Sequence, residues 1–258
     1  RTLFFELAPF ADRITIDPKG VNFANSLPRC SAPYIEWASE HAKSPQNLHA
    51  LRDTITQRKP LMPLAVVKAA PSWITPSISV PLQVPGDSQL RIYGGAFKTV
   101  DLFVDAILQA AKYCPEGWHI RIKEHPSALP FVKDAINKAK VGNVILDNTT
   151  DTFEQVKKAN LILTVNSSVG LEAMFFEKQV VACGDCFWAV EGISTSAKTP
   201  QDIADILAKP NSVTFDTQAR QAFLTYLDQC YFPKLSLPEN AAITTRIAGC
   251  DQNGFWKT

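Results

Sequence analysis

Two short polar motifs carry the residues best suited to chemistry, and each directly follows an apolar run. The first is Lys-Glu-His-Pro at 123–126, after the run 118–122. The second is Asn-Ser-Ser at 166–168, after the run 161–165. In an open parallel α/β sheet, ligands bind just beyond the carboxyl ends of the strands. Basic and hydroxyl side chains at two neighbouring strand ends therefore predict a pocket for a phosphorylated ligand, and a nucleotide is the favoured class.

The first motif offers a histidine in a restrained setting. His125 can bind phosphate or donate a proton, and Pro126 disfavours helical backbone at His125, which would hold the imidazole in one orientation. Lys123 adds a cation that suits a phosphate or a carboxylate. The alternative is that His125 only caps the start of the following helix.

The second motif is a cluster of small polar residues at the expected start of a helix. Ser167 and Ser168 can donate hydrogen bonds to phosphate oxygens, although a single serine at this position is usually an N-cap. Asn166 and Gly170 make the cluster more polar and more open than capping requires. Glu172 can accept from ribose hydroxyls; it can equally be a capping-box partner or a solvated residue.

Three other carboxylates occupy positions that suggest a role in a cleft. Asp17 lies in a turn-forming loop after an apolar run, where it can act as nucleophile or base, and a plain turn aspartate fits the local sequence equally well. Glu6 lies inside an apolar run, so it is either exposed at an edge or buried with a raised pKa. Asp87 follows a strand-like run and can line the same cleft, form a turn or cap a helix.

From Ser77 onward the hydrophobic pattern alternates between strand and helix, which predicts an α/β fold with a doubly wound parallel sheet. The expected strands cover Ser77–Val84, Trp118–Ile122, Asn143–Leu146, Leu161–Val165 and Gln179–Ala182. The expected helices cover Thr99–Tyr113, Ala128–Lys140, Asp151–Ala159, Ser168–Phe176 and Gln201–Ala208, with N-caps at Asp151 or Thr152 and at Thr199.

Three domains are expected. Residues 1–76 form a partial N-terminal domain and connector, with one or two strands in 1–16, a helix in 35–58 and connector prolines at 60, 63 and 71. Residues 77–210 form the Rossmann-like domain. Residues 211–258 form C-terminal helices, expected over 217–229 and 240–250, that pack back across the domains. Because the chain starts inside a strand-like run, we expect it to be a fragment.

Composition narrows the class of protein. The 258 residues are 46% hydrophobic, enough for one large core or two modest ones. The 26 basic and 25 acidic residues nearly balance, so no nucleic-acid partner is expected. No apolar run reaches the ~20 residues of a membrane span, and no signal peptide is recognised. Six scattered cysteines favour a reducing cytoplasm, and Cys183 and Cys186 are interpreted as thiols flanking a turn, with no metal expected.

The combination of motifs resembles a known family. Lys-x-His-Pro followed by Ser-Ser resembles the CMP-sugar site of bacterial GT-B glycosyltransferases, including certain sialyltransferases. The loop 16–22, the strand and turn 80–88 and the stretch 167–173 leading to 178–181 are similar to a narrower group, the capsule polysaccharide and O-antigen β-Kdo transferases. The resemblance covers roughly residues 3–193. It implies a GT-B-like fold with one complete Rossmann-like domain and part of an acceptor-side domain.

The resemblance also implies roles for individual residues. The donor-binding set would be Gln83, Asp87, Lys123, His125, Pro126, Asn166, Ser167, Ser168 and Glu172. Within it, the serines and His125 would hold phosphate, and Glu172 would hold ribose. Asp17 would be the nucleophile of a double displacement with retention, and Glu6 is the competing carboxylate. No metal or other cofactor is implied.

The implied function is transfer of Kdo from CMP-β-Kdo to a saccharide or glycolipid acceptor, in the cytoplasm or at the cytoplasmic face of the inner membrane, with peripheral membrane contact. The acidic-acidic-Gly motif of the sialyltransferases is absent, which favours Kdo over sialic acid. Two alternatives stay open: a CMP-sialic acid transferase, and a nucleotide-binding scaffold module without catalysis.

Overall fold

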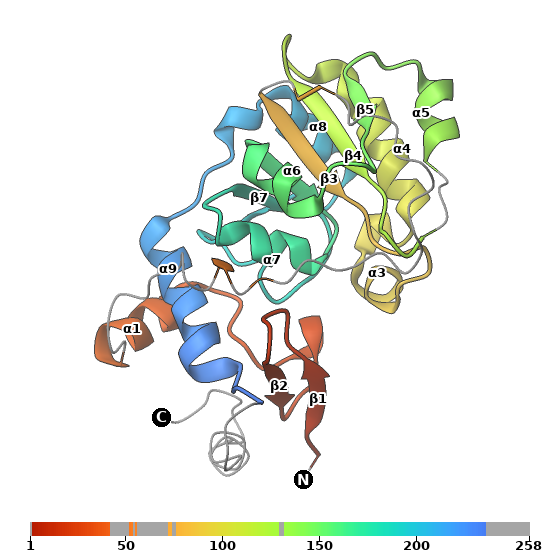
Figure 1. Ribbon diagram of the computed structural model, residues 1–258. Helices are drawn as coiled ribbons and strands as arrows, with labels where there is room; N and C mark the ends of the chain where they lie inside the picture. Colours follow the sequence, from red (N-terminus) through yellow and green to blue (C-terminus); the bar gives the residue numbers. More distant parts are fainter. Residues whose placement is uncertain are drawn as a thin grey trace. The chain divides into compact units, whose positions relative to one another are not determined.

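The computed structural model describes residues 2–41, 52–53, 55, 72–73, 76–128 and 132–235. These residues divide into two compact units (Figure 1). Unit 1 draws on Arg1–Thr56, Cys186–Ile193 and Phe215–Thr258, and unit 2 on Gln57–Asp185 and Ser194–Thr214. The connector prolines at 60, 63 and 71 and the helix expected over 240–250 lie outside the described residues.

Unit 2 is built on a six-stranded, all-parallel sheet with the order β5-β4-β3-β6-β7-β8. The chain runs outward from β3 through β4 to β5, then returns to the other side of β3 and continues through β6, β7 and β8. The direction therefore reverses between β3 and β6, which is the topological switch point of a doubly wound sheet. The strands are β3 (Ser77–Pro81), β4 (His119–Lys123), β5 (Val144–Leu146), β6 (Leu161–Thr164), β7 (Gln179–Ala182) and β8 (Thr195–Ser196).

Most of the described helices of unit 2 begin at a side-chain cap. Asp151 accepts from the backbone N–H groups of Phe153 and Glu154, and Thr199 forms a capping box with Asp202, as expected. Asp87 caps a short helix, α3, that was not predicted as an element. The helices are α3 (Ser88–Tyr93), α4 (Val100–Ala110), α5 (Lys133–Ala139), α6 (Thr152–Lys158), α7 (Ser168–Met174) and α8 (Pro200–Ala208).

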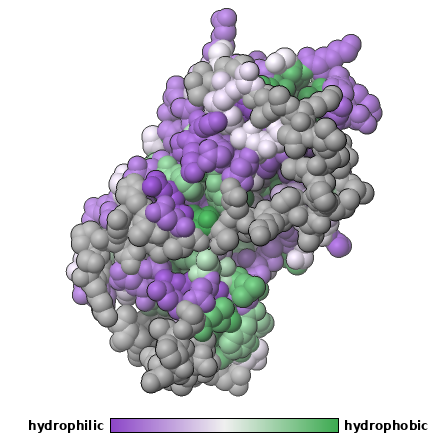
Figure 2. Space-filling model, in the orientation of Figure 1, coloured by the Kyte–Doolittle hydropathy of each residue, from purple (hydrophilic) through white to green (hydrophobic). Residues whose placement is uncertain are grey.

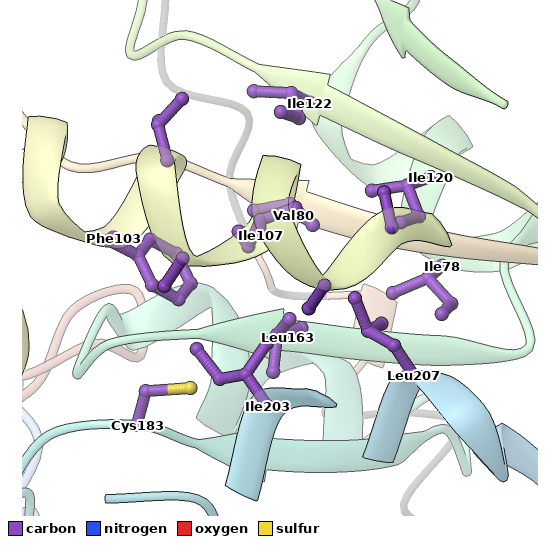
Figure 3. Close-up of a cluster of buried hydrophobic side chains, with 14 of the residues drawn as sticks. Ile78, Val80, Phe103, Ile107, Ile120, Ile122, Leu163, Cys183, Ile203 and Leu207 are labelled. Atoms are coloured by element: carbon purple, nitrogen blue, oxygen red, sulfur yellow. The ribbon is translucent and has the colours of Figure 1, made fainter. Parts of the chain in front are cut away.

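The core of unit 2 lies between the sheet and the helices α4 and α8. Figure 3 shows Phe103 and Ile107 of α4 and Ile203 and Leu207 of α8 beside the strand residues of the sheet, among them Val80. All of these side chains are buried. Fully burying one such side chain contributes about 1.5–3 kcal/mol. Helices α6 and α7 lie in front of the strands in Figure 1, whereas α4 and α8 lie behind them.

Unit 1 combines a hairpin with a helix pair from distant parts of the chain. Strand β1 (Phe4–Leu7) pairs antiparallel with β2 (Ile14–Asp17), as expected for residues 1–16. Helix α1 (Ala32–His41) packs on α9 (Thr217–Tyr226), with the rings of Tyr34 and Phe223 5.0 Å apart. Helix α9 therefore belongs to unit 1 together with α1. The packing of C-terminal helices across the domains stays a prediction.

Several predicted boundaries move. Helix α1 begins at Ala32, before the expected residue 35, and most of the expected helix beyond His41 lies outside the described residues. Helix α5 begins at Lys133, not at residue 128. The expected helix 217–229 is α-helical only to Tyr226 and then continues as the π-helical turn η5 (Leu227–Tyr231).

Three of the four exposed residues of β1 are apolar. Phe5 and Leu7 are 55% and 76% exposed, and Figure 2 shows the hydrophobic colouring in this region. Separately, among the residues that the structure describes, no helix has both the length and the apolar character that crossing a bilayer demands.

Candidate functional site

A cavity opens at the carboxyl edge of the unit 2 sheet, next to the switch point between β3 and β6. Its walls come from the ends of β3 and β4, the start of α6 and the turn from β6 into α7. The lining residues are Pro81, Leu82, Lys123, Glu124, His125, Pro126, Asp151, Thr152, Phe153, Ser167, Val169 and Glu172. The structure thus brings together five residues that the sequence singled out: Lys123, His125, Pro126, Ser167 and Glu172.

His125 is held in place by its own turn. Its ring Nδ1 lies 3.1 Å from the backbone nitrogen of Ser127, and its carbonyl accepts from the N–H of Ala128 at 2.9 Å. Because Nδ1 accepts a hydrogen bond from an N–H, the proton of the neutral ring lies on Nε2. His125 therefore both closes the turn after β4 and carries an N–H donor on its other ring nitrogen.

The Ser-Ser motif also serves two purposes. The hydroxyl of Ser167 accepts from the backbone N–H of Val169 at 3.3 Å, so Ser167 is the N-cap of α7 as well as a lining residue. Ser168 is the first residue of α7 and is half-buried. Glu172, one turn further on, is only 3% exposed, so the alternative of a solvated helix face is wrong.

Gln83, Asp87 and Asn166 form a hydrogen-bonded group along the same sheet edge, apart from the lining residues. The Gln83 amide joins Asp87 Oδ2 at 3.3 Å and accepts from the Asn166 N–H at 3.3 Å. The Asn166 side chain donates to the carbonyl of Gln89 at 3.0 Å. These contacts tie α3 to the ends of β3 and β6.

Seven of the twelve lining residues were not selected as site residues by sequence reasoning, and two of them contribute distinct groups to the cavity. Glu124 is buried, and its carboxylate accepts from the N–H of Val132 and from the Asn148 amide. Phe153 stacks on Phe176 with ring centroids 6.1 Å apart and contributes to an apolar wall with Leu82. Phe153 could have been found from its position two residues after the expected cap Asp151, at the carboxyl end of a strand.

The Lys123 side chain is hydrogen-bonded to the protein backbone. Its ammonium donates to the carbonyl oxygens of Thr150 at 2.7 Å and of Asn148 at 3.3 Å. Burial lowers the pKa of Lys123, although the charges of Asp147 and Asp151 act in the opposite direction. The cavity therefore has a polar side with a buried cation and an apolar side with an aromatic ring, a combination that fits an amphipathic ligand.

Asp17 lies in unit 1 and is completely buried. Its Oδ1 accepts from the N–H groups of Lys19 and Gly20 at 2.8 and 3.2 Å. Its Oδ2 accepts from the N–H and hydroxyl of Ser26 at 2.9 and 2.7 Å and from the hydroxyl of Tyr231 at 2.9 Å. Asp17 therefore organises the loop that follows β2 and joins it to the π-helical turn η5.

Glu6 is exposed on β1, so its alternative reading as a buried acid is wrong. Its carboxylate lies 3.2 Å from the Asn22 side-chain amide. Within the described ranges, no group of three His, Cys, Asp or Glu side chains is arranged to hold a metal ion. Cys183 and Cys186 are both buried and are not disulfide-bonded.

The amino-acid sequence matches a known protein family. Residues 65–231 match the family described as "Capsule polysaccharide biosynthesis protein". The chain belongs to this capsule family. The match includes both polar motifs and every lining residue of the cavity. The capsule-family chain is also 31% identical over 254 residues to "Protein FixF" of Sinorhizobium fredii, which covers 97% of this chain. It spans 59% of that curated relative's length.

A solved structure shows the same fold. The capsule-family chain is similar to Thermosulfurimonas dismutans KpsC, titled a beta Kdo 2,7 transferase, with a TM-score of 0.52 and 18% identity over 88% of this chain and 67% of that one. The KpsC structure titled a beta Kdo 2,4 transferase has a TM-score of 0.48 and 15% identity over 86% and 70%. The α/β, GT-B-like class predicted from the sequence is confirmed.

Proposed function

We propose that this chain is a glycosyltransferase of bacterial surface polysaccharide biosynthesis that transfers Kdo, with retention, from CMP-β-Kdo to a saccharide or glycolipid acceptor. The observation that carries the proposal is the unit 2 cavity, which gathers His125, Ser167 and Glu172 beside an apolar wall at the switch point of the sheet. Membership of the capsule family and a fold similar to a structure titled a Kdo transferase support it.

The nucleotide would lie along the two sides of the cavity. The Nε2–H of His125 and the hydroxyls of Ser167 and Ser168 would donate to the phosphate, where negative charge grows as CMP leaves. The buried carboxylate of Glu172 would accept from ribose hydroxyls. The base would pack against Leu82 and Phe153. Hydrogen-bond donors thus meet the anion, and apolar groups meet the ring.

Retention would follow from two displacements. A carboxylate oxygen of Asp17 would attack the anomeric carbon as its bond to the CMP oxygen breaks, and the acceptor hydroxyl would then displace Asp17 from the same carbon. The hydroxyls of Ser26 and Tyr231 now donate to Oδ2, and both can rotate away, which would leave this oxygen with the backbone N–H of Ser26. Glu6 is the second candidate for this role.

The donor site is tested by calorimetry with CMP. We expect His125→Ala to weaken CMP binding about 10–150-fold, because a hydrogen bond to a charged group contributes about 1.5–3 kcal/mol. His119→Ala is the matched control, since His119 lies at the start of β4, the opposite end of the strand that His125 follows. Equal losses in the two variants, or no binding of CMP by the wild type, would overturn the site.

The reaction is tested by intact mass after incubation with CMP-Kdo generated in situ. A Kdo-sized adduct on the Asp17 peptide, retained in Glu6→Gln, is the expected result. An adduct on Glu6 would move the nucleophile there.

One observation favours the scaffold alternative. The hydrogen bonds of Asp17 explain its burial without any reaction. CMP binding without an adduct and without consumption of CMP-Kdo would support that reading.

A further inference from the structure

We propose that Lys123 and Glu124 of the Lys-Glu-His-Pro motif are positioning residues, which hold the loop 147–151 against the end of β4. The position of this loop would fix the position of Asp151–Phe153, which line the cavity. The inference rests on the proposed nucleotide site for its ligand, but the loop contacts stand independently of it. In this assignment His125 is the residue of the motif that hydrogen-bonds to the phosphate. Lys123 affects the ligand only indirectly, through the position of the loop 147–151.

The Lys123 ammonium is directed at the loop. Two of its three hydrogens are accounted for by the carbonyls of Thr150 and Asn148, at 2.7 and 3.3 Å. Lys123 is only 8% exposed, and both of these hydrogen bonds are partly buried. Removing the ammonium would leave two partly buried carbonyl acceptors without this donor, which destabilises this particular backbone conformation.

Glu124 forms hydrogen bonds with the same loop at a second residue, Asn148. Its backbone N–H donates to Asn148 Oδ1 at 2.9 Å, and its Oε2 accepts from Asn148 Nδ2 at 2.6 Å. This two-point pairing fixes both the distance and the rotation of the Asn148 side chain. The other oxygen, Oε1, accepts from the N–H of Val132 at 2.8 Å, just before α5. Glu124 thereby contacts both the loop 147–151 and the segment just before α5.

Further hydrogen bonds within the loop, and from the loop to β4 and α6, stabilise its backbone. Asp147 Oδ1 accepts from the N–H groups of Thr149 and Thr150 at 3.1 and 2.9 Å, and its Oδ2 is paired with Arg121 at 2.7 Å. Gln155 of α6 donates to the carbonyl of Asp147 at 2.7 Å. The backbone from 147 to 150 is therefore anchored to β4 on one side and to α6 on the other.

What this network holds is the lining of the cavity. Asp151, at the end of the loop, and Thr152 and Phe153 after it line the cavity together with His125 and Ser167. A shift of the loop would move the wall against which the base packs. A positioning role therefore predicts that losing Lys123 weakens the binding of a nucleoside and of its monophosphate by the same factor, whereas a phosphate ligand would weaken only the monophosphate.

The first test compares cytidine and CMP binding by calorimetry in Lys123→Met. We expect both affinities to fall by the same factor, about tenfold. Lys178→Met is the matched control, because the Lys178 ammonium also donates to a backbone carbonyl, Lys157 O at 2.7 Å, outside the cavity. An unchanged cytidine affinity with a large loss for CMP would overturn the proposal and make Lys123 a phosphate ligand.

The second test needs no ligand and so separates this inference from the proposed function. Hydrogen exchange followed by mass spectrometry reads the amides of Thr149 and Thr150 in the peptide that contains the loop. We expect exchange to accelerate tenfold or more in Lys123→Met and to be unchanged in Lys178→Met. Lys123→Arg, which keeps a donor of positive charge, is expected to restore part of the protection.

Asn148→Asp gives a second variant that leaves Lys123 in place. Asn148 is half-buried, and the aspartate would face Glu124 with a like charge in place of a donor. We expect the same faster exchange in the loop. Wild-type exchange in both Lys123→Met and Asn148→Asp would overturn the proposal, whether or not CMP binds.

Discussion

Replacing Asp17 by asparagine tests how much its buried carboxylate stabilises unit 1. The amide must turn its NH2 group toward the donors on one side. At the Oδ1 position it would face the N–H groups of Lys19 and Gly20; at the Oδ2 position it would face one N–H, that of Ser26, and two hydroxyls that can rotate to accept. The second orientation costs less, because it loses one backbone hydrogen bond outright.

The magnitude follows from these contacts. A hydrogen bond to a charged group contributes about 1.5–3 kcal/mol, and an unsatisfied buried donor costs about 1–3 kcal/mol. We therefore expect Asp17→Asn to lower the free energy of unfolding of unit 1 by about 2–4 kcal/mol. With a urea m-value of about 1–3 kcal/mol/M, the midpoint should fall by about 1 M or more.

The assay is hydrogen exchange across a urea series, read separately in peptides of unit 1 and unit 2. Asp216→Asn is the matched control in the same unit, because Asp216 is an exposed N-cap of α9 and asparagine caps equally well. The reasoning is refuted if Asp17→Asn shifts the unit 1 midpoint no more than Asp216→Asn does. Asp17 would then owe its position to chemistry, and the mass-adduct experiment would decide its role.

Three further outcomes follow from unit 2. Arg121→Met leaves the fully buried Asp147 carboxylate without its cation and should cost about 3–5 kcal/mol, measured by thermal unfolding. Burial raises the pKa of Asp147, but hydrogen bonds from Thr150 and Thr149 outweigh it, so the net pKa is lowered. The contribution of Asp147 to folding stability is therefore present above the unfolded pKa of ~3.9 and is lost as pH falls through the lower folded pKa. We expect acid titration of stability to show a steeper loss in the wild type than in Asp147→Asn. Burial raises the pKa of Cys114 to about 11, so iodoacetamide at pH 8 should alkylate it about 100-fold more slowly than an ordinary thiol, as followed by peptide mass spectrometry.

The sequence predicted most of unit 2 because its signals are local. Each strand is a short apolar run, and Asp151 and Thr199 mark helix starts by chemistry that acts within three residues. The rule that ligands bind at strand ends then sufficed to place His125, Ser167 and Glu172 in one region. Helix α3 was missed because its six residues are too few for a periodic pattern, although its cap, Asp87, was recognised as one possibility.

What escaped prediction depends on contacts between distant parts of the chain. Tyr231 donates to Asp17 from 214 residues away, and no local pattern indicates such a pair. The same applies to the helix pair α1 and α9, and to the segment Cys186–Ile193, which belongs to unit 1 although sequence alternation places it within the second domain. The hydrogen bonds of Lys123 also escaped prediction, because its partners are backbone carbonyls, which no side-chain pattern reveals.

The pairing of α1 with α9 sets the order in which this protein can be completed on the ribosome. The aromatic side chains of Tyr34 and Trp37 are covered by Phe223 and Tyr226, which are synthesised long after them. At roughly 5–20 residues per second, α9 follows the end of α1 by roughly 10–40 s. All of the strands of unit 2 emerge in that interval. The nascent chain must therefore keep an aromatic helix face exposed while the parallel sheet forms, which makes α1 the segment most in need of a chaperone during synthesis.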